Sequence, residues 1–508
     1  MLKFWKKNKK GQDILYEEKP ENENVTLTGE NVEKLLCDSS DIIIRELYVN
    51  EDKDLKVTLC FVDGMINSKL VSDDILKPLQ QESALKEAKS GQEIIDLIKH
   101  GALYTTSVLT RDEVDDTIND ILNGSVALIF DKEKIAMTFD TKGFQMRSVS
   151  EPTDENVIKG SKDSFIEVIR VNTALVRRKI RTQNLRIKQM VVGQQTVTPV
   201  AICYIDGIAS KSIINEIEKR LQKIDIDAVL TSASIEEYIT DNRTSAFPQI
   251  LYTERPDKFC MNLLDGRVGI LIDGLPTAFV APAAISQFLK APEDYSKNFL
   301  VASMISFIRY LSIIMTLFLP GFYIAVASFH QEMIPTDLAL AIISSKQGVP
   351  FPTFVEVIIM LLAFEVLLEA GIRLPKSIGQ AVSIVGALVV GQAAVEAKMV
   401  SPGVVIVVAI TVISGFTMPN QDFANALRLW RFILTIFASI SGLFGLTVGL
   451  VVLTIHLASM ETFGVPYLSP YSANEDVDIA TDTIFRLPLW LMKKRPKNLK
   501  SVNRQKQK

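Results

Sequence analysis

The pattern of hydrophobic and polar positions changes at about residue 298. Before this point charged side chains are frequent and short apolar runs alternate with polar residues. From 299 to 458 charges are sparse, and several apolar runs approach the ~20 residues that cross a bilayer as a helix. We therefore predict an α/β soluble N-terminal region of two repeated subdomains, followed by an all-α polytopic membrane domain.

An internal repeat lies within the soluble region. LCFVDGMINSKLVSDDILKPLQ from Leu59 resembles ICYIDGIASKSIINEIEKRLQ from Ile202, and NGSVALIFDKEKIAMTFD from Asn123 resembles DGRVGILIDGLPTAFVAP from Asp265. Each copy predicts a strand that ends at Asp-Gly, an amphipathic helix, further helices and a strand, and a closing hairpin. Asp-Gly is most simply a turn, because glycine permits positive φ.

The predicted organisation has six parts. They are a basic and polar N-terminal segment at 1–50, subdomain 1 at 51–150, a basic linker helix at 151–195, subdomain 2 at 196–298, a transmembrane helical domain at 299–458, and a cytosolic tail at 459–508 that is basic at its end. The linker carries basic residues that fit either pairing with acidic neighbours or an anionic partner: Arg170, Arg177, Arg178, Lys179, Arg181, Arg186 and Lys188. Nucleic acid is disfavoured because the net charge is −4 and no base-stacking motif is present.

Both ends of the chain are expected in the cytosol. The N-terminus has no secretory apolar core, and RLPLWLMKKRPKNLKSVNRQKQK from Arg486 is basic without acids. Because both ends are expected on the same side of the membrane, the number of spans should be even. The candidate apolar segments are 300–328, 354–372, 377–396, 403–418 and 432–456, together with a short piece at 334–344. The segment 354–372 suits a re-entrant or protein-buried helix, Arg309 suits snorkelling to the interface, and Asp422, Arg428 and Arg431 suit span boundaries.

Catalytic and metal motifs do not occur in the sequence. It has no GxGxxG, Walker loop, GxSxG or HExxH, and its three histidines and four cysteines show no metal-binding spacing. We predict no enzyme activity, no cofactor and no metal site. The cysteines Cys37, Cys60, Cys203 and Cys260 fit mostly buried, reduced thiols of a cytosolic region.

Four charged residues are predicted at membrane depth, in a stretch whose apolar character makes each of them costly: Glu356, Glu365, Glu369 and Arg373. Each therefore needs a partner, a protein-buried site or a water-filled path. Glu369 and Arg373 are four residues apart on one helix face, which favours a structural ion pair.

The segment 377–396 has two different faces when it is drawn as a helix. At 100° per residue, one face collects the small residues Ser383, Ala387, Gly391 and Ala394, which permit close packing of another helix. The other face collects Val385, Leu388, Val389, Gln392 and Glu396. An apolar ring followed by an amide and a carboxylate is what a hydrophobic gate with a cation-attracting mouth requires. The alternative is that the apolar side chains face lipid and Glu396 pairs with Lys398.

Four stretches resemble one known family. FPQILYTERPDKF from Phe247, EAGIRLPKSIGQAVSIVGALVVGQAAVEA from Glu369 and VSPGVVIVVAITVISGFTMPN from Val400 closely resemble the A subunits of spore germinant receptors, the GerA family. SEPTDENVIKGSKDSFIEVIRVNTALVRRKI from Ser150 is also similar, with Ser161 where members often have proline. The resemblance covers nearly all of 59–471.

The resemblance implies an inner spore membrane protein that acts with a transporter-like, nutrient-binding B subunit and a lipoprotein C subunit. It implies a homo-oligomer in membrane lipid that conducts ions when nutrient arrives, with the helix of Val385, Leu388 and Gln392 lining the pore. The alternative function is a non-conducting scaffold that couples the B subunit to downstream germination proteins.

Overall fold

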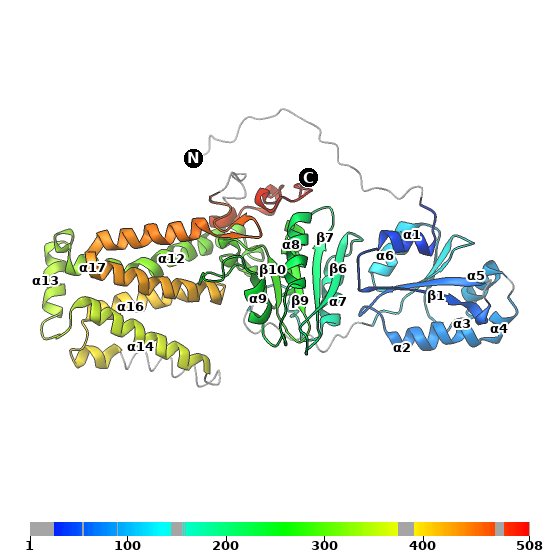
Figure 1. The fold of residues 1–508 in the computed structure, drawn as a ribbon, viewed down its shortest axis with the longest axis horizontal. Coiled ribbons are helices and arrows are strands. Elements are labelled where there is room, and N and C mark those ends of the chain that lie inside the picture. Colours follow the sequence, from blue (N-terminus) through cyan, green and yellow to red (C-terminus); the bar gives the residue numbers. More distant parts are fainter. Residues whose placement is uncertain are drawn as a thin grey trace, which may run out of the picture. The chain divides into compact units, whose positions relative to one another are not determined.

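The chain forms two compact units. The computed structural model describes residues 25–52, 55–88, 90–143, 155, 157, 159–373, 391–472 and 482–506. One unit comprises Met1–Phe144 with Arg181–Gln183, and the other comprises Gln145–Ile180 with Asn184–Lys508. Colours in Figure 1 follow the sequence through both units.

A five-stranded antiparallel sheet forms the centre of the first unit, in the order β1-β2-β4-β5-β3. Its strands are β1 (Ile42–Tyr48), β2 (Lys56–Val62), β3 (Val108–Arg111), β4 (Val126–Phe130) and β5 (Ile135–Phe139). Its helices are α1 (Gly29–Leu35), α2 (Ser68–Leu70), α3 (Lys77–Gln81), α4 (Ser83–Lys86), α5 (Gly91–Lys99) and α6 (Val114–Leu122). A π-helical turn, Val71–Leu76, joins α2 to α3. One apolar cluster from the sheet and helices makes the core.

The second unit begins with a sheet of the same design, in the order β6-β7-β9-β10-β8. Its strands are β6 (Leu185–Val192), β7 (Thr198–Ile205), β8 (Leu251–Thr253), β9 (Val268–Ile272) and β10 (Ala278–Ala281). Its helices are α7 (Ile169–Lys179), α8 (Lys211–Gln222), α9 (Ala233–Ile239), α10 (Pro256–Asp265) and α11 (Ile285–Phe288). The equal strand orders confirm that the sequence repeat is a structural repeat, with closing hairpins β4–β5 and β9–β10.

The repeated Asp-Gly pair forms a turn in both copies. β2 ends at Val62 and β7 ends at Ile205, directly before each pair. Gly64 has φ 79° and Gly207 has φ 76°, a left-handed conformation that glycine adopts without steric cost. The backbone N–H of Gly207 also donates to Asp206 Oδ1 at 3.0 Å. These residues therefore have a structural role as turns.

Two predicted boundaries are wrong, because each places an edge strand outside its sheet. β1 lies in the segment 1–50 that was predicted as a separate N-terminal part, and β6 lies in the predicted linker helix 151–195. Only α7 is helical in the centre of that linker. In β6 the basic residues Arg186 and Lys188 alternate with Leu185 and Ile187, which are both 0% exposed, so the period is two and not 3.6.

The helical part of the second unit follows its sheet. It comprises α12 (Phe299–Ser328), α13 (Thr336–Ser345), α14 (Thr353–Arg373), α16 (Pro402–Gly415) and α17 (Gln421–Ser459), and then the short strands β11 (Glu461–Thr462) and β12 (Val465–Pro466). α12, α14, α16 and α17 lie side by side (Figure 1). Among the described residues, α12 and α17 are long and apolar enough to cross a membrane.

α17 is a helical hairpin and not one straight span. The helix breaks at Ser441 and Gly442, where Gly442 has φ 62° and ψ −136°. A Cβ atom on Gly445 would lie 2.0 Å from the carbonyl oxygen of Phe437, and one on Gly449 would lie 2.7 Å from Leu434 Cδ2. The two arms therefore pack closely through glycines. The predicted segment 432–456 is wrong in its limits because it runs through this turn.

Candidate functional site in the helical domain

Glu356 begins the series of charged residues on α14 and is completely buried, with 0% exposure. Its Oε2 accepts a hydrogen bond from the backbone N–H of Ser401 at 2.7 Å. Its Oε1 lies 3.6 Å from Lys346 Nζ. The carboxylate thus joins the start of α14 to the loop before α16 and to the residue after α13, and these contacts offset the cost of burying its charge.

Glu365, nine residues after Glu356 on α14, pairs with two arginines of α17. Arg431, which is 2% exposed, donates from Nη2 to Glu365 Oε1. Arg428 Nη1 lies 3.9 Å from the other carboxylate oxygen. The prediction that Arg428 and Arg431 mark the boundary of the last span is therefore wrong. Their helix begins at Gln421, ten residues before Arg431, so this arginine lies within the helical bundle.

Glu369 and Arg373 form the ion pair that their spacing indicates. Arg373 Nε donates to Glu369 Oε1 at 2.9 Å along the same face of α14. Both side chains are exposed, with 61% and 77% of their area accessible. All three glutamates of α14 thus have a cationic partner within the described residues.

The predicted pore-lining helix is described only at its end. Val385, Leu388 and Val389 lie outside the described residues, as do Ser383 and Ala387 of the small face. The described part, 391–396, is helical.

The two described members of the small face pack inward. A Cβ atom on Gly391 would lie 3.5 Å from Val405 Cγ1 of α16, an ordinary contact distance. Ala394 packs against the apolar cluster that includes Val404 and Val408 of the same helix. Gln392 and Glu396 are exposed. The end of this segment therefore has one face against α16 and one polar face that the described residues leave open.

The ion pair between Glu396 and Lys398, which the lipid-facing alternative invoked, is absent from the described residues. Both side chains are exposed. Lys398 has φ 56°, which marks the turn where the helix ends. The Nζ atom of Lys398 lies instead beside Gly348, 3.0 Å from the position that a Cβ atom would occupy on that glycine.

An aromatic cluster joins the second sheet to the helical domain. Phe247 lies between β7 and β8 in sequence, and its ring is 5.9 Å from that of Phe423, 6.4 Å from Trp430, 6.2 Å from His456 and 6.3 Å from Tyr467. Phe423 lies near the start of α17 and His456 near its end. Both ends of the helical hairpin therefore meet this sheet, and the turn at Gly442 lies near Phe329, which follows the last residue of α12.

Polar contacts reinforce the same junction. The Ser245 hydroxyl lies 2.9 Å from His456 Nε2, and Asp241 Oδ2 accepts from the backbone N–H of Phe463 at 2.7 Å. Arg309 of α12 is 6% exposed and pairs with Asp294 at 3.0 Å. The prediction that Arg309 snorkels to the interface is wrong, because the loop before α12 supplies its carboxylate partner.

Glu236 on α9 is a titratable group at this junction, outside the helical domain. Burial raises the pKa of its carboxyl to about 7, and the negative charges of Asp422 and Glu237 contribute to the shift. A carboxyl with this pKa changes its charge near neutral pH, next to the first turn of α17.

Sequence reasoning missed the contacts that depend on distant segments. Phe247 falls in a stretch that resembles the family, but nothing in its spacing predicts contact with α17, about 180 residues later along the chain. The pairing of Glu365 with Arg431 had a weak signal, since both charges lie in apolar surroundings and need a partner. No group of three or more His, Cys, Asp or Glu side chains that could hold a metal lies among the described residues.

Comparison with known proteins decides the family. The profile of the family described as Bacillus/Clostridium GerA spore germination protein matches residues 30–498. The chain belongs to this GerA family. Spore germination protein A1 of Bacillus subtilis (strain 168) is 40% identical over 470 residues, which are 92% of this chain and 96% of that protein. Spore germination protein KA of the same strain is 37% identical over 469 residues, 92% of this chain and 85% of that protein.

A third relative carries no functional name. The "Uncharacterized membrane protein YfkQ" of Bacillus subtilis (strain 168) is 38% identical over 493 residues, which are 96% of this chain and 94% of that protein. The crystal structure of the N-terminal domain of the A subunit of the Bacillus megaterium spore germinant receptor GerK3 matches 51% of this chain and 96% of that domain. Its sequence identity is 31% and its TM-score is 0.41.

GerA membership supports a role in spore germination for this chain. Two of the relatives described above are named spore germination proteins, and neither name refers to an enzyme activity. The two apolar helices, together with a relative that is named a membrane protein, support membrane association.

Proposed function

We propose that this GerA protein is the A subunit of a nutrient-responsive germinant receptor in the inner spore membrane, and that several copies surround an ion-conducting pore. Its N- and C-terminal regions lie in the cytosol, and its membrane domain is polytopic. It acts with a transporter-like B subunit that binds nutrient and with a lipoprotein C subunit. Family membership supports the receptor role, and the polar face of the segment 391–396 supports the pore.

One observation carries the pore proposal. The carboxylates of α14 are all neutralised by cations of this chain, whereas Gln392 and Glu396 are exposed on a segment whose other face packs on α16. Polar groups in an apolar domain need water or polar partners around them. A water-filled axis between copies meets that need, with Val385, Leu388 and Val389 as the gate and Glu396 at its mouth.

The junction supplies a route by which a signal in the cytosolic region reaches the helices. Phe247 contacts both Phe423 and His456, so a movement of the second sheet displaces both ends of α17 together. α17 packs along α12, and α12 in turn packs on α16. The pore segment is therefore connected to the sheet by a continuous set of packed helices, which is the physical requirement for coupling.

Ion flux through reconstituted protein tests the pore. The chain is placed in vesicles with its B and C partners, and ion release is measured with and without nutrient. Val385→Ala and Leu388→Ala should each raise flux without nutrient. The smaller alanine side chain widens the apolar ring, and a wider ring excludes water less strongly. The matched controls Val451→Ala and Leu429→Ala remove the same atoms from exposed sites of α17 and should not. Unchanged flux in both gate variants would falsify the pore assignment.

The second candidate is a non-conducting scaffold, favoured by the repeated sheet. Two copies of one five-stranded design provide two surfaces of the same kind for partner proteins. This role predicts that vesicles show no flux under any gating condition while the chain still binds the B subunit. The same experiment therefore separates the two candidates.

A further inference from the structure

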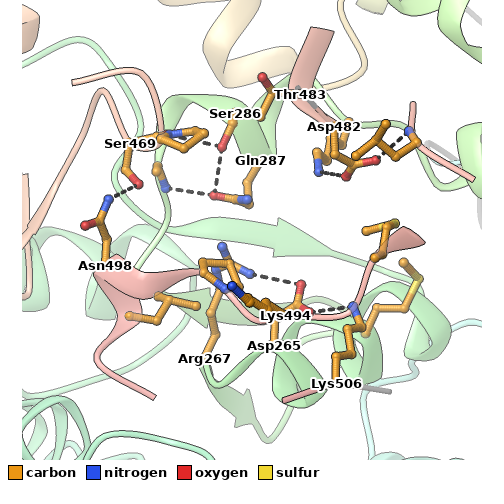
Figure 2. Close-up of a pocket in the computed structure, with 18 of the residues that line it drawn as sticks. Asp265, Arg267, Ser286, Gln287, Ser469, Asp482, Thr483, Lys494, Asn498 and Lys506 are labelled. Carbon is orange, nitrogen blue, oxygen red and sulfur yellow. Dashed lines mark hydrogen bonds and ion pairs between the residues drawn. The ribbon is translucent and has the colours of Figure 1, made fainter. Parts of the chain in front are cut away.

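A cavity lies between the second sheet domain and the chain segment that follows α17. Its volume is about 270 Å³. Figure 2 shows Asp265 and Arg267, from the end of α10 and the loop after it, on one side, and Ser286 and Gln287 of α11 on the other. Residues of the C-terminal tail, including Lys494, Asn498 and Lys506, close the remaining walls.

Specific contacts hold the tail in place as a wall of this cavity. Lys506 Nζ lies 2.7 Å from Asp265 Oδ1, and Lys290 Nζ lies 2.8 Å from Asp482 Oδ2. Arg495, which is 7% exposed, donates to the carbonyl oxygen of Leu264. The tail is thus a folded part of the second unit, and the cavity is built from segments more than 200 residues apart in sequence.

Positive charge predominates in the lining. The cations are Arg267, Lys290, Lys493, Lys494 and Lys506, and the acids are Asp265 and Asp482. Asp265 pairs with Lys506 and also lies 3.6 Å from Arg267, and Asp482 pairs with Lys290. The five cations and two acids give the lining a net positive formal charge, which favours an anionic ligand. The side-chain amide of Gln287 also points toward the opening in Figure 2 and adds a hydrogen-bond donor.

The other part of the lining is apolar and comes mainly from the tail. It includes Leu487, Leu489, Leu491 and Met492. A site that combines cations with this apolar strip fits a ligand that has both an anionic group and a hydrocarbon part. Fully hydrophilic anions gain nothing from the apolar strip.

Contacts with α12 place this strip beside the start of a membrane helix. The Trp490 ring lies 6.1 Å from that of Phe299, the first residue of α12, and Phe485 stacks on Phe307 at 6.1 Å. Trp490 is 66% exposed and Phe485 is 48% exposed. Exposed aromatic side chains at the end of a spanning helix are typical of the headgroup level of a bilayer. The cavity therefore lies next to the depth at which lipid phosphates occur.

We propose that this cavity binds the phosphate group of an anionic phospholipid, with the lysines of the tail around the phosphate and the acyl chains leaving over Leu489 and Trp490. The cavity is slightly smaller than the ~300–1,000 Å³ of common small-molecule sites. This size suits a headgroup and not a whole lipid. Soluble phosphate esters share the same anionic chemistry, and competition with glycerol 3-phosphate separates them from lipid.

Lipid binding to the full-length chain in detergent tests the proposal by native mass spectrometry. Phosphatidylglycerol should bind in preference to phosphatidylcholine. Replacing both Lys493 and Lys494 by Gln should weaken phosphatidylglycerol binding about 30-fold, since each lysine near an anionic lipid contributes ~1 kcal/mol. The control Lys497→Gln with Lys500→Gln removes the same charge from exposed tail sites outside the cavity lining and should change binding only slightly.

Three outcomes overturn the proposal. They are equal binding of the two lipids, equal loss in both double variants, and displacement of phosphatidylglycerol by glycerol 3-phosphate at comparable concentration, which would assign the site to a soluble ester. A photoactivatable phosphatidylglycerol provides a readout without any variant. It should cross-link to residues 487–494, and cross-links confined to other parts of the chain would also overturn the assignment.

Discussion

Arg431 of α17 and Glu365 of α14 form an ion pair inside the helical domain, where Arg431 is only 2% exposed. The pair connects the two helices at a point where Arg431 is buried and the Glu365 side chain is 26% exposed. A buried ion pair adds little stability compared with apolar residues, but removal of one partner leaves an uncompensated charge.

Replacing Glu365 by Gln should therefore destabilise the helical domain by about 3–5 kcal/mol, because Arg431 then stays buried without a counter-charge. The measurement is thermal unfolding of the detergent-solubilised chain. Glu369→Gln is the matched control, since it breaks the exposed Glu369–Arg373 pair on the same helix and should cost at most about 1 kcal/mol. Equal shifts in the two variants would contradict the role of Glu365 as the counter-charge of the buried Arg431.

Removing the Phe247 ring should loosen the junction between the second sheet and α17. Phe247 is 2% exposed and lies among four aromatic neighbours, so Phe247→Ala should cost about 3–5 kcal/mol of stability. Tyr238→Ala removes a ring that is 41% exposed in the same sheet domain and serves as the control. Unfolding of both variants is compared by calorimetry. A loss at Tyr238 as large as that at Phe247 would exclude a special role for the cluster.

Stability at the junction should fall as pH rises toward neutrality. The pKa of Glu236 is about 7 in the folded chain, raised first by burial and then by Asp422, and its ordinary value is 4.5. The folded state thus retains a proton that the unfolded chain releases, so the stabilisation present below pH 4.5 is lost as pH increases from 4.5 to 7. Melting temperatures at pH 5 and pH 8 measure this loss. Glu236→Gln should largely remove the difference, whereas Glu237→Gln should reduce it only slightly, because its charge is the last of the three causes of the raised pKa. An unaltered difference in Glu236→Gln argues against the assignment.

Charge at Glu396 should control cation flux if the pore is formed as proposed. A carboxylate at the mouth raises the local concentration of cations, so Glu396→Gln should lower cation flux by about tenfold at low salt, and much less at high salt. Vesicle flux assays with potassium and chloride reporters measure both rate and selectivity. The control Glu369→Gln also removes one exposed carboxylate. The same reduction of cation flux in that variant would contradict the placement of Glu396 at the mouth of the pore.

Thiol labelling should distinguish the four cysteines. Cys37 is exposed, whereas Cys60, Cys203 and Cys260 are buried, and burial raises the pKa of Cys60 and Cys260 to about 12. Buried thiols react slowly because the thiolate is the reactive form. A maleimide should therefore modify one cysteine in the folded chain and all four in denaturant. Cys37→Ser should abolish labelling of the folded chain, and persistent labelling in that variant would indicate that a buried site opens.

Local sequence was sufficient wherever neighbours along the chain create the structure. The repeat predicted two sheets of one design because buried strands such as β4 and β9 are apolar at every position. It did not predict β1 or β6, since an edge strand has one pairing partner and carries polar residues such as Arg45 and Lys188. The glycine at 442 gave no signal of a chain reversal within a long apolar run, because its conformation is fixed by close packing of the two arms.

The sequence by itself determined the division into a charged and an apolar half, the internal repeat, the family motifs and the Glu369–Arg373 pair, because each depends on composition or on spacing within one element. The tertiary structure decided which charges are buried together, that α17 returns to the second sheet, and that the basic tail closes a cavity. These features join residues far apart in the chain, and no local periodicity records which distant segment will supply a partner for Glu365, Phe247 or Asp265.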